Sequence, residues 1–140
     1  MLDYGGRVSK RFHFSAAHRI TSKGLSEAEN EARYGKCTRL HGHNYVLFVH
    51  VYGPIDPETG MIIDLSLLKR TVEEGIIDVL DHGNVNEVIG SGLGTTEVLA
   101  KWIYERLNYI CSSYTCKFQI ELWETENNQV LYPAVIPDYY

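Results

Sequence analysis

Positive charge is scarce in this chain of 140 residues, which carries 13 lysines and arginines against 18 aspartates and glutamates, a formal net charge of -5. No cluster of basic residues forms a stripe that could follow a phosphate backbone. Proteins that bind nucleic acids usually carry such a stripe, because neutralised phosphates supply much of the binding energy. We therefore expect no nucleic-acid partner.

Long apolar segments are also missing. A run of about 18 apolar residues is the usual sign of a membrane-spanning helix, and the chain has none. Residues 1–10 lack the apolar stretch of a secretory leader. These two absences favour a cytoplasmic protein without a membrane partner.

Cysteine is scarce as well. The odd number of three, Cys37, Cys111 and Cys116, excludes a disulfide framework in which every cysteine pairs within one chain. Cys111 and Cys116 have no histidine near them in the sequence, so we expect them to pack as small apolar residues. Cys37 differs because histidines follow it closely.

The length fits one domain over residues 1–140, and the apolar pattern predicts an α+β fold. Ser26 and Glu29 form a possible capping box for a short helix. The remaining expected elements are a strand over 8–18, a strand over 43–52 that turns into a short strand over 61–63, a helix capped by Asp64 or Ser66 that ends near residue 80, a second helix that begins after the glycine-rich residues 90–94, and strands over 117–124 and 130–132.

Three histidines predict a metal site. Side chains two apart on a strand share a face, so His41 and His43 can reach one ion across Gly42, and His18 lies at or just past the end of the first strand. Three imidazoles leave one open position on a tetrahedral zinc ion, which is typical of catalytic rather than structural sites. Zn2+ is the cofactor we expect.

Cys37 leaves two interpretations open. It could close a structural zinc site as the fourth ligand, or it could lie close to the ion without binding it and act as a base. A nearby cation favours the thiolate form of a cysteine. The position of Cys37 outside the predicted strand favours the catalytic interpretation.

Two further sets of polar residues carry possible chemistry. Asp81 and His82 end a predicted helix, where an aspartate that orients a histidine would form a general acid/base pair. Glu124 shares the parity of Phe118, Ile120 and Leu122 and so points inward, where an unpaired carboxylate needs a ligand or a donor.

Together these residues resemble the 6-pyruvoyl-tetrahydropterin synthase family, which includes the 6-carboxy-tetrahydropterin synthases of deazapurine and queuosine biosynthesis. The resemblance spans nearly the whole chain and follows the order of the family's motifs. Its motifs are Phe14-Ser15-Ala16-Ala17-His18-Arg19, Gly35-Lys36-Cys37, His41-Gly42-His43-Asn44-Tyr45, Gly60-Met61, Leu80-Asp81-His82, Thr95-Thr96-Glu97 and Glu124-Thr125.

The resemblance implies a tunnelling fold: an antiparallel four-stranded sheet with two helices on one face, whose subunits close into a trimeric barrel. It also implies a homohexamer formed as a dimer of trimers, with sites between subunits. Glu124 and Cys37 would then serve one pocket from different chains.

The resemblance also implies roles for the site residues. His18, His41 and His43 would hold zinc, Cys37 would be the base, and Asp81 with His82 would form a second proton-transfer unit. Glu124 would anchor the pterin of 7,8-dihydroneopterin triphosphate, with Thr95 and Thr96 beside it. The reaction would be elimination of triphosphate in tetrahydrobiopterin biosynthesis by a carbon-oxygen lyase.

Three alternatives stay open at the level of the sequence. The three residues between Cys37 and His41 resemble the carboxy-forming branch, which releases acetaldehyde, whereas residues 22–37 and 124–128 resemble the pyruvoyl branch. A non-catalytic, zinc-stabilised oligomeric binding module is the alternative of another class. The triphosphate partners, among Arg19, Lys23, Lys36 and Arg39, and the role of residues 133–140 are also open.

Overall fold

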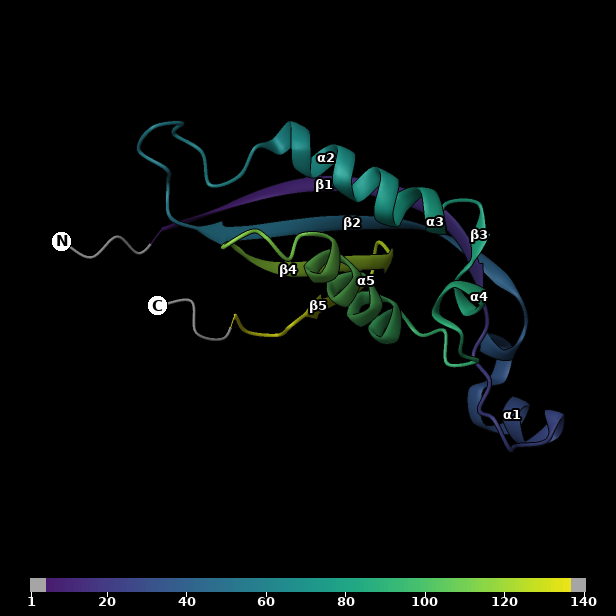
Figure 1. The fold of residues 1–140 in the computed structure, drawn as a ribbon. Helices are drawn as coiled ribbons and strands as arrows, with labels where there is room; N and C mark the ends of the chain where they lie inside the picture. The colour runs from purple at the N-terminus through teal and green to yellow at the C-terminus, as the bar shows by residue number, and fades with distance from the viewer. Residues whose placement is uncertain (1–4, 137–140) are drawn as a thin grey trace.

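One five-stranded sheet forms the centre of the molecule in a computed structural model that describes residues 5–136 (Figure 1). The strand order is β3-β1-β2-β4-β5, and the sheet is open, with β3 and β5 at its edges. The strands are β1 (Gly6–His18), β2 (His41–Gly53), β3 (Gly83–Asn84), β4 (Lys117–Thr125) and β5 (Asn128–Tyr132).

The four longer strands pair antiparallel, as the family resemblance implies. The two residues of β3 pair parallel with β1, so the complete sheet is mixed. This fifth strand is too short to leave an alternating pattern in the sequence.

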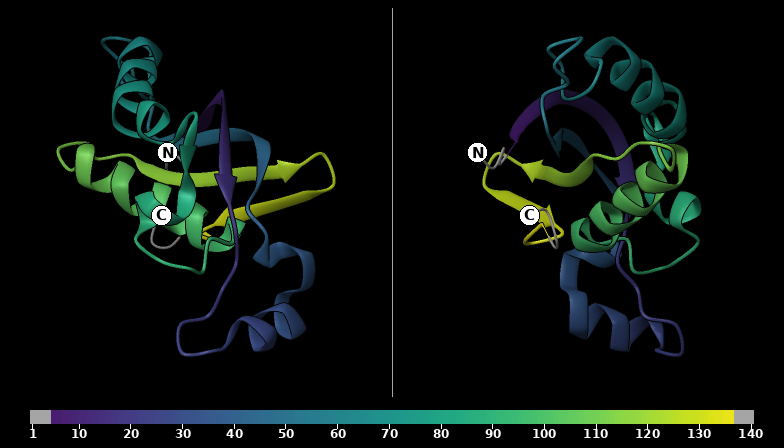
Figure 2. Two further views of the ribbon diagram at one scale, coloured as in Figure 1. Left: turned by 90° about the vertical axis from the view of Figure 1, so that its right-hand side faces the viewer. Right: turned by 60° about the vertical axis from the view of Figure 1, so that its left-hand side comes forward.

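Two helical segments cover the same face of the sheet (Figure 2). The first is continuous through α2 (Leu65–Val72), the π-helical η2 (Glu73–Ile77) and α3 (Asp78–Leu80), and the second is α5 (Thr96–Ile110). Asp64 begins α2 by accepting hydrogen bonds from the backbone of Ser66 and Leu67. The apolar residues of β1, β2 and β4 that face these helices are fully or nearly fully buried and make the core.

The predicted strand over 61–63 is wrong. Residues 57–59 form a turn, and Ile62 and Ile63 pack against the core without joining the sheet. The physical reason is that β2 already pairs with β1 on one edge and β4 on the other, so no edge of β2 is free for a hairpin partner.

The shorter helices complete the fold. The capping box of Ser26 and Glu29 begins α1 (Glu27–Tyr34), as predicted, and a 3-10 turn, η1 (Gly35–Thr38), follows it. The helix α4 (Val85–Ile89), which lies between β3 and the glycine-rich loop, was not among the elements expected from the sequence. These elements matter because η1 carries Cys37 and α4 carries Asn86.

Cys111 lies in the core and Cys116 packs against it, as predicted. Burial raises the pKa of Cys111 to about 11, which makes this thiol a poor nucleophile at neutral pH. Between residues 5 and 136, no helix has the length and apolar character needed to cross a membrane. Residues 1–4, part of the segment that lacks the pattern of a secretory leader, and residues 137–140 lie outside the described range. The single domain over 1–140 stays a prediction.

Candidate metal centre

The three histidines converge at one end of the sheet, on the face that the helices cover. His18 is the last residue of β1 and stands opposite His41, the first residue of β2, while His43 stands opposite Ala16. Their potential ligand atoms all lie within 4.8 Å of one another, and the three ring centroids are 4.5 to 5.0 Å apart. The parity argument from the sequence therefore predicts the cluster correctly.

Hydrogen bonds prepare two of these rings to bind a cation. His18 Nδ1 donates to the carbonyl of Gly94 and His41 Nδ1 donates to the carbonyl of Arg39, each at 2.6 Å. Because a carbonyl only accepts, the proton sits on Nδ1 and the lone pair stays on Nε2. This is the arrangement that metal-binding histidines usually show.

Unsatisfied ring nitrogens indicate that the group fits a metal ion. Nε2 of His18 and Nε2 of His43 are buried without a hydrogen-bond partner, which is rare unless a ligand satisfies them. Burial lowers the pKa of His43, although Glu124 opposes the shift, and a neutral imidazole is the form that binds metals. Three nitrogen donors suit zinc among other divalent ions.

Cys37 lies outside this cluster. It belongs to η1, its side chain is exposed, and it is not among the groups whose ligand atoms lie within 4.8 Å of one another. Its carbonyl accepts a hydrogen bond from Ile20, two residues after His18, so η1 is tied to the same end of β1. This position does not match a four-ligand site closed by a thiolate.

Asp81 and His82 form a hydrogen-bonded pair just after α3. His82 Nδ1 lies 2.9 Å from Asp81 Oδ2, and the backbone of Ser15 donates to Asp81 Oδ1 at 2.8 Å. These bonds, the Ser15 one first, lower the pKa of Asp81 and keep it ionised. His82 has φ near 60°, a conformation that non-glycine residues adopt mainly at functional or tightly constrained positions.

A shallow cavity lies between His82 and His43. It has a volume of about 340 Å³, and both His43 and His82 line it, together with residues of β1 and β2. Of the acid/base pair only His82 lines this cavity, and of the metal cluster only His43. The lining also includes Ser15, Ala17 and Asn44, whose strand parity is opposite to that of the three histidines.

Glu124 links the metal cluster to a second cavity, of about 480 Å³. Its Oε1 lies 3.0 Å from His43 Nε2, without the geometry of a hydrogen bond. The hydroxyl of Thr96 donates to its Oε2. Thr95 instead accepts from the backbone of Val98 and caps α5. The predicted inward direction of Glu124 is correct.

Tyr45, for which no role was expected from the sequence, is fully buried beside the cluster. Its ring stacks on Phe14, and its centroid lies 5.8 Å from that of His43. The hydroxyl has no hydrogen-bond partner, and burial raises the pKa of this phenol. The signal in the sequence was available, because Tyr45 shares the parity of His41 and His43.

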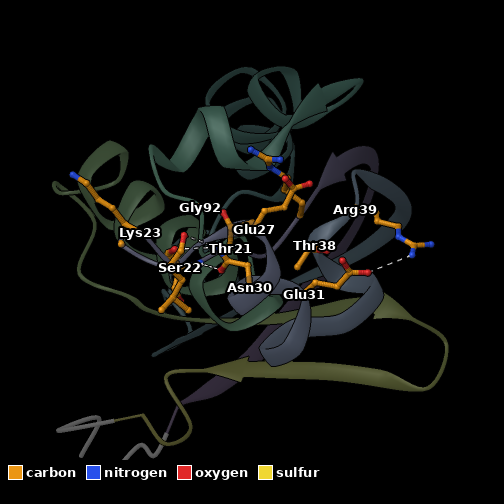
Figure 3. Close-up of a pocket in the computed structure, with 12 residues that line it drawn as sticks. Thr21, Ser22, Lys23, Glu27, Asn30, Glu31, Thr38, Arg39 and Gly92 are labelled. Atoms are coloured by element: carbon orange, nitrogen blue, oxygen red, sulfur yellow. Dashed lines mark hydrogen bonds and ion pairs between the residues drawn. The ribbon is translucent and has the colours of Figure 1, made fainter.

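The basic residues near the site do not converge. Arg19, Lys23 and Arg39 line a cavity of about 730 Å³ between the end of β1 and α1, whereas Lys36 does not. In Figure 3 the Lys23 side chain extends away from the others, and Arg39 pairs with Glu31 at 3.7 Å. This cavity is therefore not a preformed anion site.

Fold and site together define an α+β protein with a candidate three-histidine metal centre, a carboxylate in contact with it, and a separate Asp81–His82 pair. The sequence model of the 6-pyruvoyl tetrahydropterin synthase family matches residues 7–134 of this chain. The 6-pyruvoyl tetrahydrobiopterin synthase of Homo sapiens is 41% identical over 138 residues, covering 91% of this chain and 94% of the human one. That of Drosophila melanogaster is 36% identical and covers 93% of this chain and 80% of its own.

Solved structures indicate the same family. The 6-pyruvoyl tetrahydropterin synthase of Caenorhabditis elegans superposes with a TM-score of 0.84 at 35% identity, covering 91% of this chain and 94% of that one. The chain belongs to the 6-pyruvoyl tetrahydropterin synthase family. It is an enzyme of that type, a lyase.

Proposed function

We propose that this protein is a zinc-dependent 6-pyruvoyl-tetrahydropterin synthase that eliminates triphosphate from 7,8-dihydroneopterin triphosphate. The observation that carries the proposal is the contact of Glu124 with His43, which sets a carboxylate beside a three-histidine cluster at the end of one sheet. The names of the relatives support the same reaction.

His18, His41 and His43 would hold the zinc ion through their Nε2 atoms. A bound zinc ion supplies Lewis acidity, which makes nearby hydroxyl protons easier to remove. Cys37 is the proposed base on one side. His82, held by the ionised Asp81, is the proposed proton carrier on the other side.

Glu124 is the proposed pterin anchor, because an ionised carboxylate can accept two parallel N–H bonds from the amino-pyrimidinone edge. Glu124→Gln should raise KM by about 10- to 100-fold, since hydrogen bonds to charged groups contribute about 1.5–3 kcal/mol. The measurement is triphosphate release against substrate concentration. Glu126→Gln, an exposed carboxylate two residues along the chain, is the matched control. An unchanged KM for Glu124→Gln would remove the anchor role.

The reaction itself is tested by incubating the zinc-loaded protein with 7,8-dihydroneopterin triphosphate. We expect released triphosphate and a pyruvoyl product by mass spectrometry. A carboxy product with acetaldehyde would instead assign the chain to deazapurine synthesis, and no turnover with zinc bound would favour the non-catalytic binding module. One assay thus separates all three functions.

We also propose that the open sheet closes between subunits. Its edge strands would otherwise stay unpaired, and barrel formation removes such edges. A homohexamer formed as a dimer of trimers, acting in the cytoplasm, is the expected form. Light scattering that gives about six chain masses supports this assembly, and a monomeric mass contradicts it.

A further inference from the structure

The side chain of Asn86 holds the backbone immediately after a metal ligand. Its Oδ1 accepts the backbone N–H of Arg19 at 2.9 Å, and its Nδ2 donates to the carbonyl of Arg19 at 2.8 Å. The amide therefore pairs with both backbone groups of Arg19, as a neighbouring strand would. Arg19 directly follows His18.

The same side chain also holds the glycine-rich loop before α5. Asn86 Nδ2 donates to the carbonyl of Ser91 at 3.0 Å, and the backbone of Ser91 donates to the carbonyl of Asn86 at 3.1 Å. One amide thus joins two segments, the end of β1 and the loop, that lie about 70 residues apart in the chain.

The loop packs closely against the segment that follows β1. Thr21 donates to the carbonyl of Gly92 at 2.8 Å, an interaction visible in Figure 3. A Cβ on Gly94 would lie 2.7 Å from Asn86 Nδ2 and 2.9 Å from the carbonyl oxygen of Arg19. Position 94 therefore has no room for any side chain while Asn86 keeps its hydrogen bonds.

This packing determines the position of one carbonyl at the metal centre. The carbonyl of Gly94 accepts the Nδ1 proton of His18, the most buried of the three histidines, at 2.6 Å. In metal sites such an outer hydrogen bond sets the tautomer and the orientation of the imidazole. A displaced Gly94 carbonyl would leave His18 free to turn.

We propose that Asn86 is a positioning residue of the metal centre. By pairing with Arg19 and Ser91 it holds the Gly94 carbonyl in place, and that carbonyl orients His18 Nε2 toward the ion. The inference rests on the metal site proposed above and adds a residue that contacts neither metal nor substrate.

The test compares zinc affinities, measured by competition with a chromophoric chelator. Asn86→Ala should bind zinc about 10- to 100-fold more weakly than the unaltered protein, the range expected for loss of an outer-shell partner. The matched control is Asn84→Ala, which removes the cap of the same short helix but no contact with Arg19. Its zinc affinity should equal that of the unaltered protein, because the hydrogen bonds that hold the outer shell of His18 are kept.

A second readout separates positioning from general destabilisation. In the metal-free protein labelled with 15N-histidine, the protected Nδ1 proton of His18 should persist in Asn84→Ala and disappear in Asn86→Ala. If Asn86→Ala does not fold, Asn86→Asp serves instead, because it keeps the size and the acceptor for Arg19 but sets an oxygen against two carbonyls. Gly94→Ala should also weaken zinc binding, because its Cβ would displace the Asn86 side chain.

The outcomes are distinguishable. Equal zinc affinities for Asn86→Ala and Asn84→Ala, with the His18 proton retained in both, overturn the positioning role alone. An unaltered protein that binds no zinc overturns the metal site and this inference with it. Weak zinc binding in Asn86→Ala only, with unfolding temperatures equal to those of Asn84→Ala, supports the inference.

Discussion

His41→Ala should abolish tight zinc binding. His41 is one of three nitrogen donors within 4.8 Å of one another. With only two of these ligands left, the protein would bind zinc too weakly to compete with a chelator. Because loss of an outer-shell partner already costs 10- to 100-fold, we expect the loss of a ligand to lower zinc affinity on the order of 1,000-fold or more. Competition with a chromophoric chelator measures it directly.

His41 is the best of the three histidines for this experiment. His18 is nearly fully buried, so its truncation would also leave a cavity, whereas His41 is only partly buried and its Nδ1 contacts the nearby Arg39 carbonyl. The unfolding temperature of the metal-free protein should therefore change little. His13→Ala, an exposed histidine on the opposite face of β1, is the matched control. Zinc affinity equal to that control would refute the assignment of His41.

The metal cluster was predictable because its geometry is local. Two histidines at alternate positions of one strand must share a face, and the antiparallel pairing of β1 with β2 then sets His18 opposite His41. Glu124 follows by the same rule, since it continues the buried parity of β4. Periodicity of two is a strong signal wherever a strand has a buried face.

The parts that the sequence could not predict depend on contacts between distant segments. Asn86 reaches Arg19 across 67 positions, and Gly94 reaches His18 across 76. No pattern in the sequence near Asn86 indicates that its side chain pairs with the backbone of Arg19. The failed strand over 61–63 has the same origin, because whether β2 has a free edge depends on the pairing of β4.

Cys37→Ala should lower kcat by about 100- to 10,000-fold, the range that a positioned general base contributes. The side chain is exposed on a 3-10 turn, so its loss should not unfold the protein. Triphosphate release at saturating substrate measures the change. Cys116→Ala, a thiol that packs at the other end of the sheet beside Gly53, is the control for a cysteine of no catalytic role.

Zinc affinity distinguishes the two roles that Cys37 could have. As a base outside the cluster, Cys37 can be removed without loss of metal, so Cys37→Ala should bind zinc as tightly as the unaltered protein while turnover falls. If Cys37 is a fourth ligand, Cys37→Ala should bind zinc more weakly, and X-ray absorption of the unaltered protein should show sulfur beside the ion. Because Cys37 lies outside the three-histidine group, we expect nitrogen and oxygen neighbours only. Full activity in Cys37→Ala would contradict the proposed mechanism, because that mechanism needs the thiolate as a base besides the Asp81–His82 pair.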